Sequence, residues 1–373
     1  MSENRVLATN GLIQIETCNE ADEELLTHLK SAVLGTPGRT RYRLTRIENK
    51  LAHMKEIYFM ILRMRSQLVG SIGFNKRSIF YGEKEYQSWY IRYFYIFAPF
   101  RSREQKKEKF RDPSKGTSMI RDAVLPYMKE PALLIPEEYD PSIKSLVYGY
   151  IESYNFRSLN MSGQSDAETV RKFTTLVFSR FRLKTVVEVR RLEENEIGDF
   201  KSRLRDFYRD YTFYTDENMF FNGNYFVYER DGEILAGVQV HPETWKIIDM
   251  PGRTNKLLIR IFPKLPYVRN IFNPDEFRFL AMEGIYYTEG NENLLQPLIE
   301  SVCKHFKTHF ALVWADVDSE LMRVLNEHID FGTIGRSFDR LGVDIRVTFN
   351  NFTEEEKMEF FQKPSYISAF DSV

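Results

Sequence analysis

Apolar and polar positions follow the same order in two separate stretches of the chain. Residues 58–70 (YFMILRMRSQLVG) and 225–237 (YFVYERDGEILAG) both carry apolar residues on either side of a polar centre, which is typical of two strands joined by a tight turn. Tyr, Phe, Arg, Leu and Gly coincide at an offset of 167 residues (225 − 58). The second copy also contains Asp231-Gly232, a pair that favours a type I′ turn. We therefore expect a β-hairpin in each stretch.

Two further pairs of segments repeat at similar spacing. Residues 13–33 and 187–207 each predict a short strand, an acidic capping stretch and a helix, at an offset of 174 (187 − 13). Residues 131–156 and 310–331 each predict an apolar strand, an acidic turn and a helix that ends at Asn155-Phe156 or Asp330-Phe331, at an offset of 175 (331 − 156). Three similar offsets in the same order predict two copies of one domain.

The repeats define the expected domains and fold class. The boundary falls near residues 182–184, after the strand-like FTTLVFSRF, which gives one domain at 1–183 and another at 184–373. No Pro- or Gly-rich linker separates the copies, so we expect them to pack together. Each copy is predicted to run strand, helix, hairpin, long strand, helix, strand, helix and two closing strands. This order predicts an α/β protein in which helices cover a mixed sheet (α+β).

Composition narrows the classes of function. The formal net charge is −1, which argues against nucleic acid as a partner, although Arg39, Arg41, Arg43 and Arg46 form a local basic stretch. No segment has the length and apolar character of a membrane helix. The chain has two cysteines, Cys18 and Cys303, and no ligand cluster for a metal, so we expect a cytoplasmic protein without a metal site.

The most unusual local feature is a basic stretch between a predicted strand and a predicted helix. An aromatic and β-branched run ends at Pro99, many Arg and Lys residues follow, and Lys115-Gly116-Thr117-Ser118 open an amphipathic helix. A helix N-terminus has unpaired backbone N–H groups and a partial positive charge, which favours a phosphate group. Glycine lets the backbone come close to such a ligand. The stretch therefore predicts an anion-binding site, whereas a solvated surface loop is the alternative for its individual lysines.

These segments resemble the GNAT superfamily of acyl-CoA-dependent N-acetyltransferases, as a tandem pair over nearly the whole chain. In that family the fourth strand often ends in an apolar-x-Pro-x-x-Arg pattern, which Phe97-Ala98-Pro99-Phe100-Arg101 matches. Family members then have a Gly-x-Gly/Ala pattern at the start of the next helix. Gly116-Thr117-Ser118 carries Ser in the last position, and about a dozen extra residues precede it.

The resemblance implies that the first copy binds acetyl-CoA or another short acyl-CoA. The implied cofactor-binding residues are Tyr95, Ile96, Phe97, Arg101, Arg103, Lys115, Gly116, Thr117 and Ser118. In the second copy Glu289 and Glu292 flank Gly290, where the family has basic and small residues. Carboxylates repel a pyrophosphate, so we expect that copy to have lost or altered its coenzyme site.

Catalysis of acyl transfer needs an oxyanion donor, a proton for the leaving thiolate and a neutral amine. The resemblance assigns the oxyanion donor to backbone N–H groups of Tyr95-Ile96-Phe97. It assigns the proton donor to a tyrosine four residues before the end of the helix that follows the fifth strand. Ile151 occupies that position, so Tyr150 and Tyr154 are the neighbouring candidates. Glu283 lies in an otherwise apolar strand and is the candidate base, with a buried ion pair to an Arg as the alternative.

The leading hypothesis is an N-acyltransferase that moves an acetyl or short acyl group from acyl-CoA to an amine. A polyamine, an aminoglycoside, an amino acid, a peptide N-terminus and a lysine all remain open as acceptors. The alternative is a non-catalytic acyl-CoA-binding or scaffold protein that retains the fold, because fold does not fix function. Nucleic-acid binding ranks last.

Overall fold

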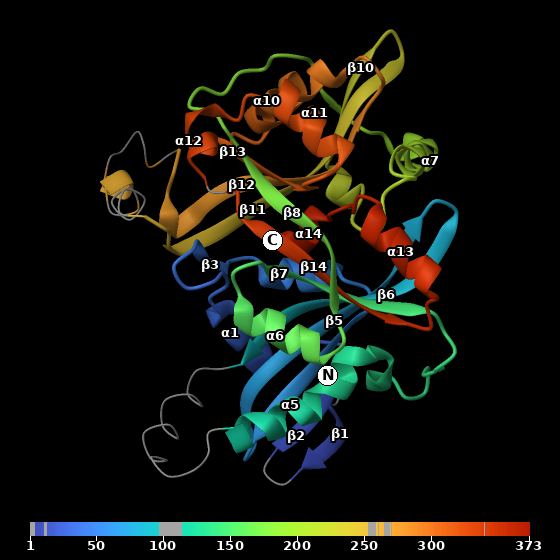
Figure 1. Cartoon of the computed structure of the whole chain (residues 1–373). Helices are drawn as coiled ribbons and strands as arrows, with labels where there is room; N and C mark the ends of the chain where they lie inside the picture. The colour runs from blue at the N-terminus through green and yellow to red at the C-terminus, as the bar shows by residue number, and fades with distance from the viewer. Residues whose placement is uncertain are drawn as a thin grey trace.

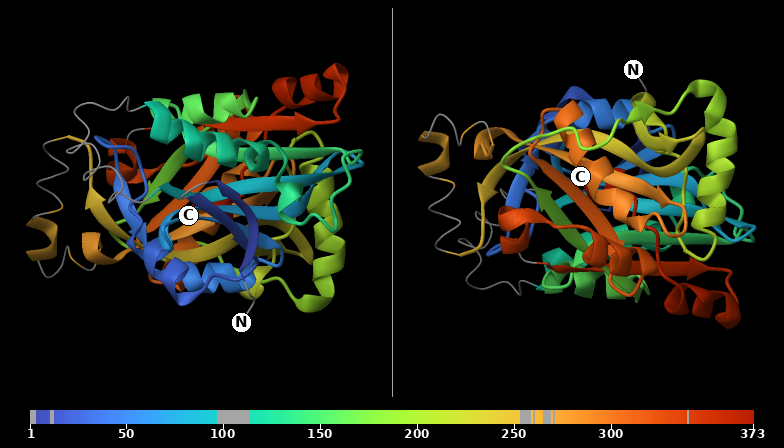
Figure 2. Two further views of the ribbon diagram at one scale, coloured as in Figure 1. Left: turned by 90° about the horizontal axis from the view of Figure 1, so that it is seen from below. Right: turned by 90° about the horizontal axis from the view of Figure 1, so that it is seen from above.

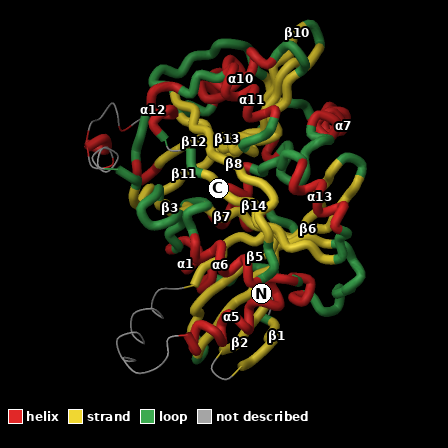
Figure 3. Tube along the Cα trace, in the orientation of Figure 1, coloured by secondary structure: helices red, strands yellow, loops and turns green. Residues whose placement is uncertain are grey.

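The computed structural model describes residues 4–10, 13–96, 114–252, 259, 261–264, 269, 271–338 and 340–373. The strands of these residues join into one 14-stranded sheet, with helices on both of its faces (Figure 1, Figure 3). The order of strands is β1-β2-β4-β5-β6-β7-β14-β8-β13-β12-β11-β10-β9, and β3 pairs separately with β11. None of the described helices has the length and hydropathy that crossing a membrane requires.

The first half of the chain contains twelve of these elements. They are β1 (Arg5–Asn10), β2 (Ile13–Cys18), α1 (Glu23–Ser31), β3 (Arg41–Leu44), α2 (Ile47–His53), β4 (Ile57–Met64), β5 (Gln67–Tyr81), β6 (Lys84–Ile96), α5 (Ser114–Lys129), β7 (Ser145–Glu152), α6 (Phe156–Gln164) and β8 (Glu168–Ser179). Helices α5 and α6 lie on one face of the strands, and α1 and α2 lie on the opposite face (Figure 2). Helix α1 begins where the Asp22 carboxylate accepts a hydrogen bond from Leu25 N (2.7 Å), as in a typical N-cap.

The second half repeats this order with small differences. It contains β9 (Arg190–Arg191), α7 (Ile197–Phe207), β10 (Tyr225–Arg230), β11 (Glu233–Asp249), β12 (Phe277–Tyr287), α10 (Leu295–His305), β13 (Phe310–Asp316), α11 (Glu320–His328), α12 (Gly332–Ser337), β14 (Gly342–Asn350), α13 (Glu354–Gln362) and α14 (Ala369–Ser372). In the described residues each half closes with one strand, β8 or β14, rather than the two that we expected.

The two halves exchange these closing strands. Strand β8 of the first half pairs with β13 of the second, and β14 of the second half pairs with β7 of the first. The two exchanged strands also pair with each other, from Gly342↔Thr174 to Val347↔Glu168. The expectation that the copies pack together is therefore confirmed. The expected domain boundary falls between β8 and β9 and stays a prediction.

Both predicted hairpins are present as antiparallel pairs, β4–β5 and β10–β11. The second turns at Asp231 (φ 53°) and Gly232 (φ 81°). The first has no glycine, yet Arg65 (φ 49°) and Ser66 (φ 66°) take the same left-handed conformation. A type I′ turn needs positive φ at both central residues, so the geometry of the hairpin overrides the preference of these two side chains.

The predicted match between residues 131–156 and residues 310–331 has the wrong register in the first half. Residues 145–152 form strand β7, which pairs in parallel with β6, as β13 pairs in parallel with β12. Asn155 begins a helix instead of ending one, because its side-chain oxygen accepts a hydrogen bond from Ser158 N (3.2 Å). Strand β7 and helix α6 therefore correspond to β13 and α11. The expectation of a helix over residues 145–156 is wrong.

Candidate active site

The candidate site lies where strands β6 and β7 part. The two strands pair in parallel only from Gln87↔Ser145 to Tyr90↔Tyr148. Beyond Tyr90, β6 pairs with β5 alone, through a bulge at which Tyr93 takes a φ of 54°. A bulge bends its strand and re-aims the following residues, so it opens the sheet on the β7 side.

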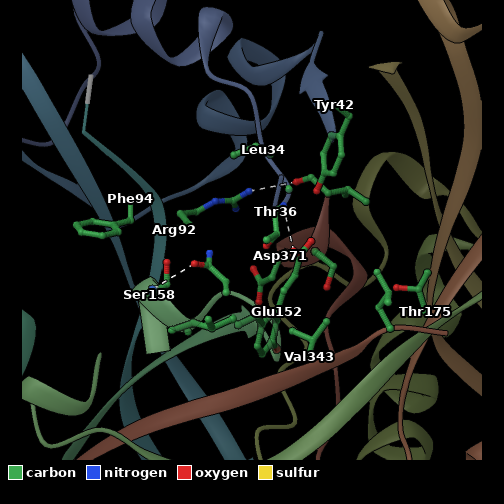
Figure 4. A pocket seen from close by; sticks show the side chains of 18 of the residues that line it. Leu34, Thr36, Tyr42, Arg92, Phe94, Glu152, Ser158, Thr175, Val343 and Asp371 are labelled. Carbon is green, nitrogen blue, oxygen red and sulfur yellow. Dashed lines mark hydrogen bonds between the residues drawn. The ribbon is translucent and has the colours of Figure 1, made fainter. Parts of the chain in front are cut away.

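A cavity of about 510 Å³ occupies this opening (Figure 4). Gly149, Tyr150 and Ile151 are consecutive residues of β7, and all three line the cavity. Successive residues of a strand point to opposite faces of its sheet. The cavity therefore passes through the opening and reaches both faces. On one face it meets α5 and α6 at Met128 and Met161, and on the other it reaches strands of the second half.

Arg92 is the most unusual polar group in this cavity. It is 7% exposed, and its guanidinium lies 4.4 Å from the ring centroid of Tyr93. One Nη donates to a Val373 oxygen at 3.4 Å, whereas Nε is buried without a hydrogen-bond partner. No Asp or Glu side chain of the described residues forms an ion pair with it. A buried cation of this kind is costly unless a ligand or the field of nearby groups offsets it.

Two carboxylates also line the cavity (Figure 4). Glu152, at the end of β7, accepts a hydrogen bond from Thr36 N at 3.0 Å. Asp371, in α14, is ion-paired with Arg77 of β5, and both side chains are buried. The Tyr148 hydroxyl contacts the same guanidinium. Asp371 is therefore fixed by its partners, and Glu152 is the more adaptable of the two carboxylates.

A second buried ion pair lies close enough to Arg92 and Asp371 for their charges to act on it. Lys50 Nζ of α2 is 3.0 Å from Glu243 Oε1 of β11, and both side chains are less than a tenth exposed. Burial lowers the pKa of Lys50 to about 8, although Glu243 partly opposes this shift. The pair joins the two halves next to the cavity.

The expected cofactor-binding residues fall into three groups. Tyr95 lines the cavity, and Ile96 is the last residue of β6. Lys115, Gly116, Thr117 and Ser118 lie in α5, which confirms a helix over these residues. Phe97, Arg101 and Arg103 lie outside the described residues. The participation of all nine residues in cofactor binding stays a prediction.

The two candidate tyrosines have different surroundings. Tyr150 lines the cavity from strand β7, not from a helix as the resemblance implied. Burial is the main cause that raises the pKa of Tyr150 well above the usual value, and the neighbouring Tyr148 adds to it. The Tyr150 hydroxyl therefore stays protonated at neutral pH. Tyr154 lies in the following turn, is 51% exposed and stacks beneath the guanidinium of Arg39 at 4.5 Å. Tyr154 is not among the residues that line the cavity.

Glu283 is buried in β12 and is not among the residues that line this cavity. One of its oxygens pairs with His241 Nε2, and the other accepts hydrogen bonds from Ala369 N (3.0 Å) and the Tyr366 hydroxyl (3.2 Å). Burial raises the pKa of Glu283, but the interactions with His241 together with hydrogen bonds from Ser368 and Tyr366 outweigh burial and hold it below the usual value. Its partner is thus a histidine rather than the Arg that we considered. These bonds tie the C-terminal segment to the second half.

The corresponding opening in the second half is filled by side chains. Strands β12 and β13 pair only from Leu280↔Ala311 to Met282↔Val313, and Gly284 then takes a φ of 56°. The Tyr208 hydroxyl donates to Ile285 O (2.6 Å), and the Tyr225 hydroxyl donates to Gly284 O (2.7 Å). A cavity of only about 10 Å³ remains there.

Of the charged side chains in the cavity, only Arg92 stands out in the sequence. Arg92 interrupts the aromatic run YIRYFYIF, and a charge inside such a strand is informative because its burial is costly. Glu152 and Asp371 lie in segments without a recognisable motif. Only the fold brings them to the same cavity.

The arrangement of each half, with a bulged strand parting from its parallel neighbour, is that of the GNAT fold, and the chain contains two such units in tandem. Solved structures with the same arrangement include N-myristoyltransferase of Saccharomyces cerevisiae with bound myristoyl-CoA (TM-score 0.55, 10% identity, 93% of this chain and 85% of that chain). The same enzyme with bound myristoyl-CoA and inhibitors gives a TM-score of 0.57 at 11% identity, over 93% of this chain and 83% of that chain. No protein-family model and no curated protein sequence matches the chain. At this identity the likeness shows the fold, and the predicted tandem GNAT fold is confirmed.

Proposed function

We propose that the protein is an N-acyltransferase that moves an acetyl or short acyl group from acyl-CoA to an amine. The observation that carries this proposal is the cavity through the β6–β7 opening of the first half. Strands that part leave backbone groups without a strand partner, and an extended, amide-containing pantetheine arm can pair with such groups. Helix α5 begins beyond the end of β6, where its N-terminus would receive the pyrophosphate.

The residues of the cavity fit the steps of acyl transfer. The amine attacks the thioester carbonyl, and a backbone N–H near Tyr95 or Ile96 would stabilise the oxyanion that forms. Glu152 would accept the proton that the amine loses, directly or through water. The C–S bond then breaks, and the Tyr150 hydroxyl would give its proton to the departing thiolate. Both residues are on β7 and line the same cavity.

Both cysteines of the chain are buried and free, which supports action in a reducing compartment such as the cytoplasm. The second half would support the site and not bind acyl-CoA, because Tyr208 and Tyr225 occupy its opening. The N-myristoyltransferase structures contain bound myristoyl-CoA, which supports acyl-CoA as the ligand class of this fold.

A non-catalytic acyl-CoA-binding or scaffold protein is the second candidate. The observation that favours it is the position of Tyr150, which lies on a strand and not on the helix where the family's proton donor is expected. This candidate predicts acyl-CoA binding without turnover.

Calorimetric titration and a free-thiol assay together test both candidates. We expect acetyl-CoA to bind the wild type, Gly116→Glu to abolish binding by placing a carboxylate in the first turn of α5, and Gly290→Glu to change little. Release of free coenzyme A with pooled amines would then establish transfer. Binding without release would favour the scaffold, and loss of binding only in Gly290→Glu would move the site to the second half.

A further inference from the structure

The part of the cavity that faces the second half is an aromatic chamber. We use this name for the space bounded by six residues of both halves, Tyr42, Phe173, Trp245, Phe277, Leu312 and Trp314. All six belong to the same hydrophobic cluster, whereas Met128 and Met161 of α5 and α6 belong to another. The chamber therefore lies on the face of the sheet opposite to α5.

Pairing between the halves holds the chamber together. Strand β3 of the first half pairs with β11 of the second, with Leu44 opposite Trp245. The rings of Tyr42 and Trp245 stack with centroids 3.8 Å apart and planes within 13°. The ring centroids of Phe173 and Tyr150 are 4.9 Å apart, so the chamber borders the proposed proton donor.

The charges around the cavity are few and balanced. Of the described residues that line it, four have charged side chains, namely Arg92, Glu152, Arg346 and Asp371. Two cations and two carboxylates give no net attraction for a polycation. Asp371 is moreover already paired with Arg77. A polyamine or an aminoglycoside, which needs several carboxylates, does not fit these surroundings.

One polar group in the chamber lacks a partner. Trp245 is 7% exposed, and its Nε1 is buried with no hydrogen-bond acceptor among the described residues. Buried donors are nearly always satisfied, by protein, by water or by a ligand. An oxygen on the bound molecule would satisfy this one.

From these observations we propose that the acceptor is a monoamine with a compact, ring-bearing apolar body and an oxygen that accepts from Trp245 Nε1. The inference rests on the proposed function and specifies its acceptor. An apolar chamber disfavours the ammonium form of an amine, so it lowers the pKa of the bound amine and increases the neutral, nucleophilic fraction. Acyl-CoA would approach from the α5 face and the amine from the chamber, with the thioester in the opening between them.

The test compares the binding of three amines by calorimetric titration to the full chain. Tyramine supplies a ring, one amine and one oxygen, phenethylamine lacks the oxygen, and spermidine is a polycation. We expect tyramine to bind at least tenfold more tightly than spermidine. Trp245→Phe keeps the ring and removes the donor, so it should abolish the advantage of tyramine over phenethylamine.

Variants of Tyr42 test the chamber itself. Tyr42→Ala should weaken the binding of tyramine about three- to tenfold, because one aromatic contact is lost. Tyr42→Phe keeps the ring and should leave this binding unchanged. Binding of acetyl-CoA should be the same in all variants, which also shows that they are folded. If Tyr42→Ala instead weakens decanoyl-CoA and leaves tyramine unchanged, the chamber holds an acyl chain and the proposal is wrong.

Two other outcomes separate this inference from the proposed function. Tighter binding of spermidine, or of a peptide with a free N-terminus, than of tyramine overturns the acceptor class while acetyl-CoA binding still supports an acyltransferase. Tyramine binding without any binding of acetyl-CoA supports the amine-binding chamber and overturns the transferase.

Discussion

The hydroxyl group of Tyr150 provides a test between an enzyme and a non-catalytic scaffold. If its hydroxyl protonates the thiolate, Tyr150→Phe should lower kcat by about 100-fold, the lower end of what general acid catalysis contributes, and leave acetyl-CoA affinity nearly unchanged. The ring remains, so its contacts with Tyr90 (5.1 Å) and Phe173 (4.9 Å) persist. Measuring kcat, affinity and melting temperature on the same preparation checks this. An unchanged kcat with a lower melting temperature would leave the hydroxyl with a structural role only.

Lys50 predicts how stability depends on pH. Burial lowers its pKa in the folded state to about 8, from about 10.5 when unfolded, so between these values the unfolded chain binds more protons. Stability from this group must therefore rise with pH between 8 and 10.5, by up to about 3 kcal/mol for the full shift. Urea unfolding at several pH values gives the free energy of unfolding of the wild type and of the double variant Lys50→Met/Glu243→Gln. The difference between the two isolates the contribution of this pair, because the other titrating groups are the same in both proteins. If the stability of the wild type relative to the double variant stays constant or falls as the pH rises, the lowered pKa of Lys50 is contradicted.

The elements show which parts of the fold a local pattern can predict. The second hairpin, helix α1 and the β13–α11 unit were predicted because each has a clear period and a local capping or turn signal, and the first hairpin was predicted from its match to the second. The likeness of residues 131–156 to residues 310–331 predicts a helix at 145–156, and a short apolar run such as this one fits either a helix or a strand. Strand pairing with β6 and β14 decides the outcome, and both partners are distant in sequence.

Helix α12 provides a stability test for the packing of an exchanged strand. It lies against β8, and a Cβ on Gly335 would be 2.0 Å from Val177 O. Gly335→Ala should therefore lower the free energy of unfolding by about 1–3 kcal/mol, as expected when a packed contact must move apart. Gly198→Ala is the matched control, because this exposed position in α7 has nothing within 4 Å of a Cβ and should gain up to about 1 kcal/mol. Equal urea midpoints for the two variants would show that α12 is not closely packed.

Over the whole molecule, the repeated domain was predictable and the way in which its copies combine was not. Similar offsets indicate two related halves, and the strand end at residues 97–101 predicts an acyl-CoA site in the first of them. Nothing local indicates that β8 and β14 change places, since each strand has the same pattern in either position. The aromatic chamber depends on that exchange and on the β3–β11 pairing, so its residues could not be grouped from the sequence.

The exchange predicts that the chain holds together after its backbone is cut between the halves. Residues 180–189 connect β8 to β9, and Phe181 within them is 52% exposed, so a protease site inserted after Arg182 should be accessible. After cleavage, β8 of the first fragment still lies between β13 and β14 of the second. We expect the fragments to elute together at the volume of the intact protein and to unfold in one transition. Each fragment refolded alone should aggregate, because β7 and β13 would expose unpaired edges. Two separate peaks of folded fragments in native buffer would show that each half keeps its own closing strand in solution.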